Sequence, residues 1–197
     1  MRNGERSVWF EAPTERDFYI LMNFDRSVAK IEEQPLYIHY KDDEGVGRRY
    51  CPDALVTFEP DSGRKPHLYE IKTSAELAAR WQELRPRFKA AVRHCREVGW
   101  IFKIVTDAKI RTPRLDNIQL FSRFRAHPID EPLRQRLLAR VRTAQSIALG
   151  PLVDEFCNGK LRRADILPTV WRLIHDGELS AAIDDPITAQ TLVELGT

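Results

Sequence analysis

The order of β-prone and helical segments is the feature that most constrains the fold of this chain. Residues 13–25 have helical spacing, with Thr14 as a candidate N-cap. Four segments of β-type residues follow at 28–33, 36–40, 48–58 and 67–72. Two helical segments and a last strand are then expected at 75–81, 85–98 and 100–106. Antiparallel strands followed by a helix and another strand indicate an α/β fold with a mixed β-sheet flanked by helices.

The remainder of the chain has a different pattern. Residues 113–125 predict a helix that leaves the sheet, and the Pro128 and Pro132 region indicates a boundary. Three short helices and a small hairpin are expected at 133–144, 147–157, 164–175 and 177–183. This order is typical of a winged helix-turn-helix. We therefore expect two domains, 1–125 and 126–197, the second small and mainly helical.

Composition excludes several classes of protein. The chain has 197 residues, of which 43% are hydrophobic and 30% are charged, as in globular proteins with a real core. The longest apolar run, 18–22, is far too short to cross a membrane, and no signal peptide is expected. Three widely spaced cysteines fit no zinc pattern and indicate a reducing compartment. We expect a cytoplasmic protein.

A near-neutral total charge hides one basic stretch. The formal net charge is +2, but residues 80–125 hold 12 basic and 4 acidic residues. The segment 126–197 holds 8 basic and 10 acidic residues. Five cations share the helical segment in the basic stretch: Arg85, Arg87, Lys89, Arg93 and Arg96. They are either phosphate contacts or a solvated helix face.

The strongest chemical motif is Pro52-Asp53 followed by Glu70-Ile71-Lys72. Glu70 and Lys72 lie two residues apart in one expected strand and therefore point to the same face. If the neighbouring strand begins at Asp53, two carboxylates and one ammonium converge. Such a cluster costs desolvation free energy unless a metal or a substrate completes it. The alternative is a Pro-Asp turn beside a solvated Glu-x-Lys strand face.

Hard oxygen ligands favour Mg²⁺ or Mn²⁺ at this point. A divalent cation lowers the pKa of a bound water and neutralises charge on a phosphate. Lys72 can orient the attacking water, and Glu15 of the first helix can supply a third carboxylate.

The motif resembles the signature of the PD-(D/E)xK restriction-endonuclease-like superfamily, and its surroundings resemble one branch of it. The quoted segments are Thr14–Phe18, Glu33-Gln34-Pro35, Arg49–Val56, Tyr69–Lys72 and Phe102–Asp107. In this order and spacing they are similar to the TnsA endonuclease of heteromeric cut-and-paste transposons, over about residues 8–112. The C-terminal helices resemble that family's winged-helix domain.

The resemblance implies a role for each matching residue. Glu15, Asp53 and Glu70 would bind two Mg²⁺ or Mn²⁺ ions, and Lys72 would be the catalytic lysine. Gln34, which precedes Pro35 at a strand boundary, would either support the site or have a structural role in a turn. The implied reaction is hydrolysis at the 5′ ends of the transposon in double-stranded DNA. The implied partners are a TnsB-like transposase, which processes the 3′ ends, and a TnsC-like ATPase regulator.

Two other functions stay open. One is a stand-alone restriction or repair nuclease on the same fold, and the other is a non-catalytic DNA-binding or adaptor protein. Because helix 164–175 carries Asp165 and its domain is net acidic, protein docking is as strong an expectation as DNA readout for that domain.

Overall fold

A computed structural model describes residues 13–157 and 160–196 of the chain. It divides into two compact units, Met1–Arg111 and Thr112–Thr197. Residues 1–12, on which the expectation of no signal peptide depends, lie outside the described part. Within the described part, no helix is both long and apolar enough to cross a membrane.

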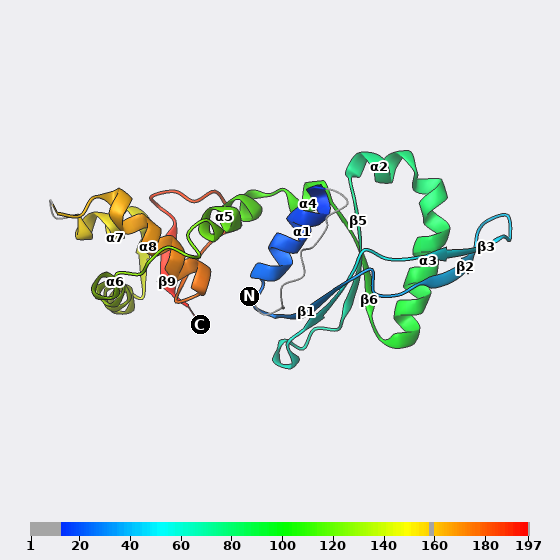
Figure 1. Cartoon of the computed structure of the whole chain (residues 1–197), viewed down its shortest axis with the longest axis horizontal. Helices are drawn as coiled ribbons and strands as arrows, with labels where there is room; N and C mark the ends of the chain where they lie inside the picture. Colours follow the sequence, from blue (N-terminus) through cyan, green and yellow to red (C-terminus); the bar gives the residue numbers. More distant parts are fainter. Residues whose placement is uncertain (1–12, 158–159, 197) are drawn as a thin grey trace. The chain divides into compact units, whose positions relative to one another are not determined.

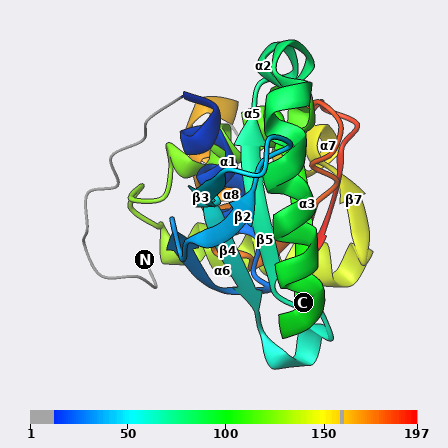
Figure 2. The ribbon, with the colours of Figure 1, turned by 90° about the vertical axis from the view of Figure 1, so that its right-hand side faces the viewer.

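The first unit contains a mixed sheet with a helix on each face (Figures 1 and 2). Its helices are α1 (Pro13–Phe24), η1 (Pro60–Ser62), α2 (Ser74–Ala79), α3 (Trp81–Val98) and α4 (Asp107–Ile110). Its strands are β1 (Val28–Glu33), β2 (Ile38–Lys41), β3 (Gly47–Tyr50), β4 (Ala54–Phe58), β5 (His67–Lys72) and β6 (Ile101–Thr106).

The main sheet has the strand order β1-β4-β5-β6. The β1–β4 and β4–β5 pairs are antiparallel, and the β5–β6 pair is parallel. The parallel pair needs a crossover connection, which α2 and α3 supply. The expected α/β fold with a mixed sheet is therefore confirmed.

The segment 48–58, expected as one strand, is two strands in two different sheets. β3 ends at Tyr50 and pairs with β2 in a separate hairpin, whereas β4 begins at Ala54 in the main sheet. Pro52 lies between them, and a proline has no N–H to donate to a strand ladder. The break places Asp53 at the start of β4.

The core of the first unit lies between the sheet, the β2–β3 hairpin and α3. Buried side chains from all three form one cluster: Ile38, Tyr50, Leu55, Leu68, Ala90, Ala91 and Cys95. On the opposite face, Phe18 of α1 packs on the Tyr69 ring with centroids 4.9 Å apart. α3 begins at Trp81 rather than at residue 85 and ends at Val98, directly before Gly99, whose φ of 78° suits glycine.

The second unit is mainly helical with a small antiparallel sheet. Its elements are α5 (Pro113–Ser122), α6 (Glu131–Ala144), β7 (Ser146–Ala148), α7 (Leu149–Phe156), α8 (Arg163–Asp176), β8 (Leu179–Ala181) and β9 (Leu192–Leu195). The expected helix 147–157 is β7 followed by α7. The expected hairpin at 177–183 supplies only β8, whose partner β9 comes later, and the sheet order is β7-β9-β8.

The boundary between the units falls at Arg111/Thr112 rather than at 125/126. The reason is α5, which packs on α8 within the second unit: Phe121 is fully buried and its ring centroid lies 5.5 Å from that of Trp171. Leu115 and Ile118 are also buried. α5 therefore belongs to the core of the second unit.

Candidate active site

Strand pairing brings the three residues of the sequence motif together. The β4–β5 register sets Ala54 opposite Tyr69, and the backbone N–H of Asp53 donates to the Tyr69 carbonyl over 3.0 Å. Asp53 therefore enters the sheet one step before Ala54, beside Glu70. Glu70 and Lys72 share one face of β5, as their spacing predicts.

The side chain of Lys72 contacts both carboxylates, those of Asp53 and Glu70. Lys72 Nζ lies 3.2 Å from Glu70 Oε1 and 3.7 Å from Asp53 Oδ2. Lys72 Nζ also donates to the Ile71 carbonyl over 3.0 Å, and the Ile71 N–H donates to Asp53 Oδ2 over 2.6 Å. The expected convergence of two carboxylates and one ammonium is present.

Glu70 is almost completely buried, with 1% of its surface exposed. Its Oε1 also accepts from Arg87 Nη2 over 3.1 Å, and its Oε2 accepts from the Tyr50 hydroxyl. A buried carboxylate needs such partners, because an unpaired buried charge costs several kcal/mol. Tyr50 and Arg87 therefore belong to the site.

Burial and crowding of charge shift the proton affinities at the site. Burial and the nearby Glu70 raise the pKa of Asp53 to about 7, against the lowering effects of Lys72 and the Ile71 N–H. Burial lowers the pKa of Lys72, but Glu70 and Asp53 outweigh it, so the net pKa is raised. Lys72 consequently keeps its proton at neutral pH.

Glu15 lies in α1 and is half-buried. Its charge is the last of the causes that raise the pKa of Asp53, which sets it near the site. The described residues nevertheless contain no group of three or more His, Cys, Asp or Glu side chains arranged to hold a metal ion. Carboxylate oxygens are the donors that Mg²⁺ prefers, so Asp53 and Glu70 fit by chemistry, as a pair rather than a trio.

Residues 25–107 match a family model described as the TnsA-like endonuclease N-terminal domain. This segment is therefore similar to TnsA-like endonuclease domains. A search of curated proteins gives no match. The TnsA-like match spans β1 through β6 and contains Asp53, Glu70, Lys72, Tyr50 and Arg87. It implies nuclease activity and a role in transposition.

Two expected features lie outside the match to the TnsA-like domain. Glu15 precedes it in the chain, and so does all of α1. The second unit follows it. The family comparison therefore bears on the Asp53–Glu70–Lys72 cluster and not on Glu15 or on the C-terminal helices.

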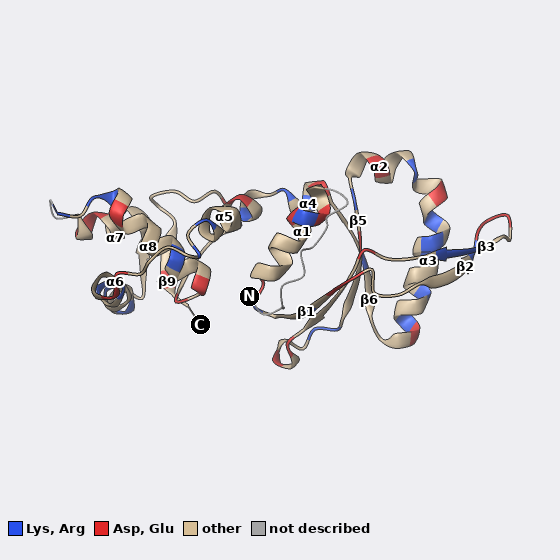
Figure 3. Ribbon diagram, in the orientation of Figure 1, with Lys and Arg blue, Asp and Glu red and all other residues tan. Residues whose placement is uncertain are grey.

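The five cations of α3 separate into two groups. Arg87 turns toward Glu70, whereas Arg85, Lys89, Arg93 and Arg96 are exposed. Figure 3 shows basic positions along α3 and on β3. No ion pair in the described part of the chain uses any of the four exposed cations, which we call the α3 stripe. Their spacing sets them on one side of the helix.

The position of Arg87 could have been found from the sequence. Leu84, Phe88 and Ala91 are buried, and Arg87 lies three residues after Leu84 and four before Ala91. This i, i+3, i+4, i+7 spacing places Arg87 on the apolar side of the helix. A cation on an apolar face needs a buried anion, and Glu70 supplies it.

Gln34 contributes through its backbone. It has a positive φ of 43°, which marks the sharp turn after β1, and its side chain is exposed. Its N–H donates to the Asp53 carbonyl over 3.0 Å, and the Tyr19 hydroxyl donates to the same carbonyl over 3.2 Å. Gln34 thus helps to fix the Asp53 backbone.

The second unit presents its arginines differently from α3. Arg140, Arg163 and Arg172 pair with Glu155, Asp154 and Asp176 respectively. Arg134 bridges Glu131 and Glu178. Arg123, Arg125, Arg136 and Arg142 are exposed and take part in no ion pair among the described residues, so the ion pairs occupy only some of the arginines of this unit.

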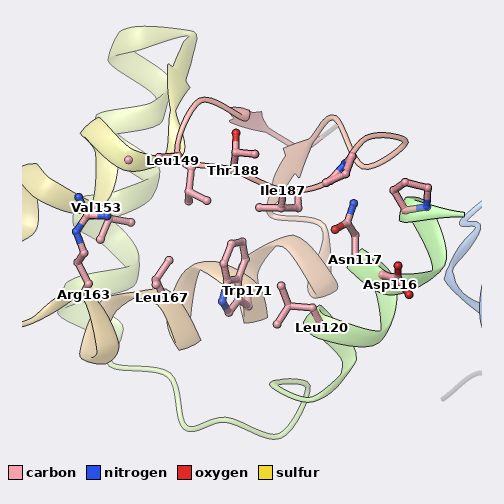
Figure 4. A pocket seen from close by; sticks show the side chains of 14 residues that line it. Asp116, Asn117, Leu120, Leu149, Val153, Arg163, Leu167, Trp171, Ile187 and Thr188 are labelled. Atoms are coloured by element: carbon pink, nitrogen blue, oxygen red, sulfur yellow. The ribbon is translucent and has the colours of Figure 1, made fainter.

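A pocket of about 440 Å³ opens in the second unit (Figure 4). Leu167 and Trp171 of α8 line it together with Leu120 of α5 and Ile187. The pocket covers the middle of α8, and α5 packs beside it. Leu167 and Trp171 therefore border open space, while the Trp171 ring also packs on Phe121 of α5.

Proposed function

We propose that this protein is a divalent-metal-dependent DNA endonuclease that cuts the 5′ ends of a transposon together with a separate transposase. The observation that carries the proposal is the contact of Asp53, Glu70 and Lys72 inside the TnsA-like endonuclease domain. Replacing such a cluster of charges by apolar residues is often neutral or stabilising for the fold, so its presence argues for a chemical role.

The metal-binding residues in this proposal are Asp53 and Glu70, with Glu15 of α1 as a third carboxylate. They would hold Mg²⁺ or Mn²⁺, two ions per site. When bound, a divalent cation neutralises charge on the phosphate and makes its water more acidic. Because Asp53 has a pKa of about 7, it must give up its proton before it can serve as a ligand.

Lys72 acts in the reaction as a cation rather than as a base. Its pKa is raised because the effect of Glu70 and Asp53 exceeds that of burial, so its ammonium stays charged. A protonated lysine can donate hydrogen bonds to the scissile phosphate and orient a water, but it cannot accept a proton. Lys72 therefore stabilises the negative charge that develops in the transition state.

The α3 stripe is the proposed contact with the DNA backbone. Its four cations are exposed and free of ion pairs such as those that occupy Arg140 and Arg163 in the second unit. Free cations on one helix side neutralise phosphates without reading sequence. The α3 stripe would bind DNA without regard to its sequence, and a partner protein would recognise the transposon end.

The second unit is proposed to be a winged helix that docks on protein. Its order α6, β7, α7, α8, β8, β9 with the sheet β7-β9-β8 supports the winged-helix assignment. The two arginines of α8, Arg163 and Arg172, pair with Asp154 and Asp176, which argues against DNA readout by that helix. The proposed partners are a TnsB-like transposase and a TnsC-like ATPase regulator.

The test is cleavage of labelled transposon ends by the purified protein with its transposase and ATPase. Asp53→Ala and Lys72→Ala should abolish 5′ cleavage while the transposase still cuts the 3′ ends. The matched controls are Asp61→Ala and Lys65→Ala, two exposed residues of the same charges in the same domain. Undiminished 5′ cleavage by both site variants would eliminate the site.

A further inference from the structure

Arg87 has an unusual setting for an arginine of a surface helix. Its side chain is 21% exposed, and its guanidinium lies 5.2 Å from the centre of the Tyr50 ring and 5.5 Å from that of Phe88. Aromatic faces attract a guanidinium and restrict its orientation. The two rings direct the guanidinium toward Glu70, which its Nη2 contacts over 3.1 Å.

One donor of the Arg87 side chain is buried in an unfavourable way. Its Nε is buried and has no hydrogen-bond partner among the described residues. A buried donor without a partner destabilises the folded state, because it loses its hydrogen bonds to water and gains none in return. The ion pair with Glu70 has to offset this cost, which explains why the side chain stays inside.

Glu70 is fully engaged by the protein's own groups. Oε1 is shared by two cations, Arg87 Nη2 at 3.1 Å and Lys72 Nζ at 3.2 Å. Oε2 accepts from the Tyr50 hydroxyl. A divalent cation that approaches Glu70 therefore meets two positive charges already in contact with the same oxygen, and like charges at such separations repel strongly in a buried site.

We propose that Arg87 is a positioning residue that serves as the internal counter-ion of Glu70 and competes with a divalent cation for its Oε1 oxygen. Without metal, Arg87 balances the negative charge of the buried Glu70 carboxylate and fixes its orientation. With metal, the guanidinium gives up this contact. The competition with a divalent cation rests on the proposed function, because it requires Glu70 to be a metal ligand. The counter-ion role of Arg87 does not depend on that function.

The first experiment measures Mn²⁺ binding by calorimetry without DNA, on the full chain. Arg87→Gln should bind Mn²⁺ about tenfold more tightly than wild type, since the competing charge is gone. Arg87→Lys keeps the charge and should stay close to wild type. The matched control is Arg80→Gln, which removes an arginine whose partners Glu76 and Glu83 lie at the surface, and which should leave Mn²⁺ affinity unchanged. Equal or weaker Mn²⁺ binding by Arg87→Gln overturns the competition.

The second experiment needs no metal. Urea unfolding is measured for wild type, Arg87→Gln, Glu70→Gln and the double variant. If Arg87 is the counter-ion of Glu70, Arg87→Gln lowers the unfolding midpoint in wild type and much less in the Glu70→Gln background. An equal loss in both backgrounds overturns the counter-ion role.

The two experiments separate this proposal from the proposed function. Coupling between Arg87 and Glu70 with no Mn²⁺ binding by any folded variant would contradict the metal site and the competition, and it would still support the counter-ion role. Coupling together with tighter Mn²⁺ binding by Arg87→Gln would support both.

Discussion

The backbone N–H of Ile71 donates a hydrogen bond to Oδ2 of Asp53 over 2.6 Å. The bond links the start of β4 to the end of β5 and fixes one oxygen of the carboxylate. Asp53 thus has two separate properties, its negative charge and its role as a hydrogen-bond acceptor. An amide oxygen can accept the bond from Ile71 as well as a carboxylate oxygen can. The negative charge and the hydrogen bond can therefore be removed one at a time.

Asp53→Asn should fold as wild type does and lose cleavage. The asparagine oxygen can still accept from Ile71, so the free energy of unfolding should stay within about 1 kcal/mol of wild type. The lost charge should reduce 5′-end cleavage by at least about 100-fold, since an amide is a poor ligand for a hard cation. Cleavage assays and urea unfolding check the two effects. Asp53→Ala, which loses both properties, should be less stable than Asp53→Asn.

Lys72→Met should reduce cleavage by about 10²- to 10³-fold, the size of effect seen when one group that stabilises transition-state charge is removed. The reason is the loss of a cation that touches both Glu70 and Asp53. Single-turnover kinetics at saturating DNA checks the prediction, with Lys65→Met as the control of equal charge change. A Lys72→Met protein with wild-type rates would show that the ammonium takes no part in the reaction.

Acid should destabilise the first unit through His67. Burial, followed by the charges of Lys103 and Arg64, lowers the pKa of His67 from 6.5 to about 4. The unfolded chain then binds a proton more readily than the folded one between these two values. Stability is fully present above pH 6.5 and falls as the pH drops toward 4, by about 1–3 kcal/mol.

His67→Asn removes this titration and keeps an acceptor for the Tyr69 hydroxyl, which lies 3.2 Å from His67 Nδ1. Its unfolding free energy should change less between pH 7 and pH 4.5 than that of wild type. Urea unfolding at the two pH values checks this. An identical pH dependence in both proteins would rule out His67 as the source.

Replacing the α3 stripe by glutamine should weaken DNA binding and flatten its salt dependence. Each phosphate contact that is lost should lower the slope of log K against log salt by about 0.9. Fluorescence anisotropy over a salt series measures this. The control replaces Arg140 and Arg163 of the second unit, whose charges are already paired with Glu155 and Asp154. A similar change of slope in the control would place the DNA contact outside the stripe.

The boundary at Arg111/Thr112 predicts which fragment folds. A fragment of residues 112–197 keeps α5 and the contact of Phe121 with Trp171. A fragment of 126–197 exposes the buried surface that Leu115, Ile118 and Phe121 cover. The longer fragment should unfold cooperatively by circular dichroism, and the shorter one should have a lower melting temperature or fail to fold. Equal melting temperatures would contradict the boundary.

Local patterns in the sequence predict the mixed sheet and the meeting of Asp53, Glu70 and Lys72. The two-residue period of a strand places Glu70 and Lys72 on one face of β5. The antiparallel pairing of β4 with β5 then brings Asp53 beside them, so one correct pairing is enough to predict the cluster. Gly99 likewise marks the end of α3 by its own conformation.

The missed features depend on contacts between distant residues. β9 pairs with β8 across a connection that has no local hairpin signal, and the split of 48–58 follows from a change of sheet. Arg87 and Tyr50 meet at Glu70 only because α3 packs on the sheet. Helical spacing separates the inward Arg87 from the exposed cations of α3, but its contact with Glu70 follows only from the packing of the helix on the sheet.

The Asp53 carbonyl accepts hydrogen bonds from both the Tyr19 hydroxyl and the Gln34 N–H. The peptide group beside the Asp53 carboxylate is thus anchored to the first helix through Tyr19 and to the turn after β1 through Gln34. These two hydrogen bonds hold the backbone of Asp53 in place. A change such as Tyr19→Phe removes one of them, so it can misalign the Asp53 carboxylate although every charged group of the site is still present.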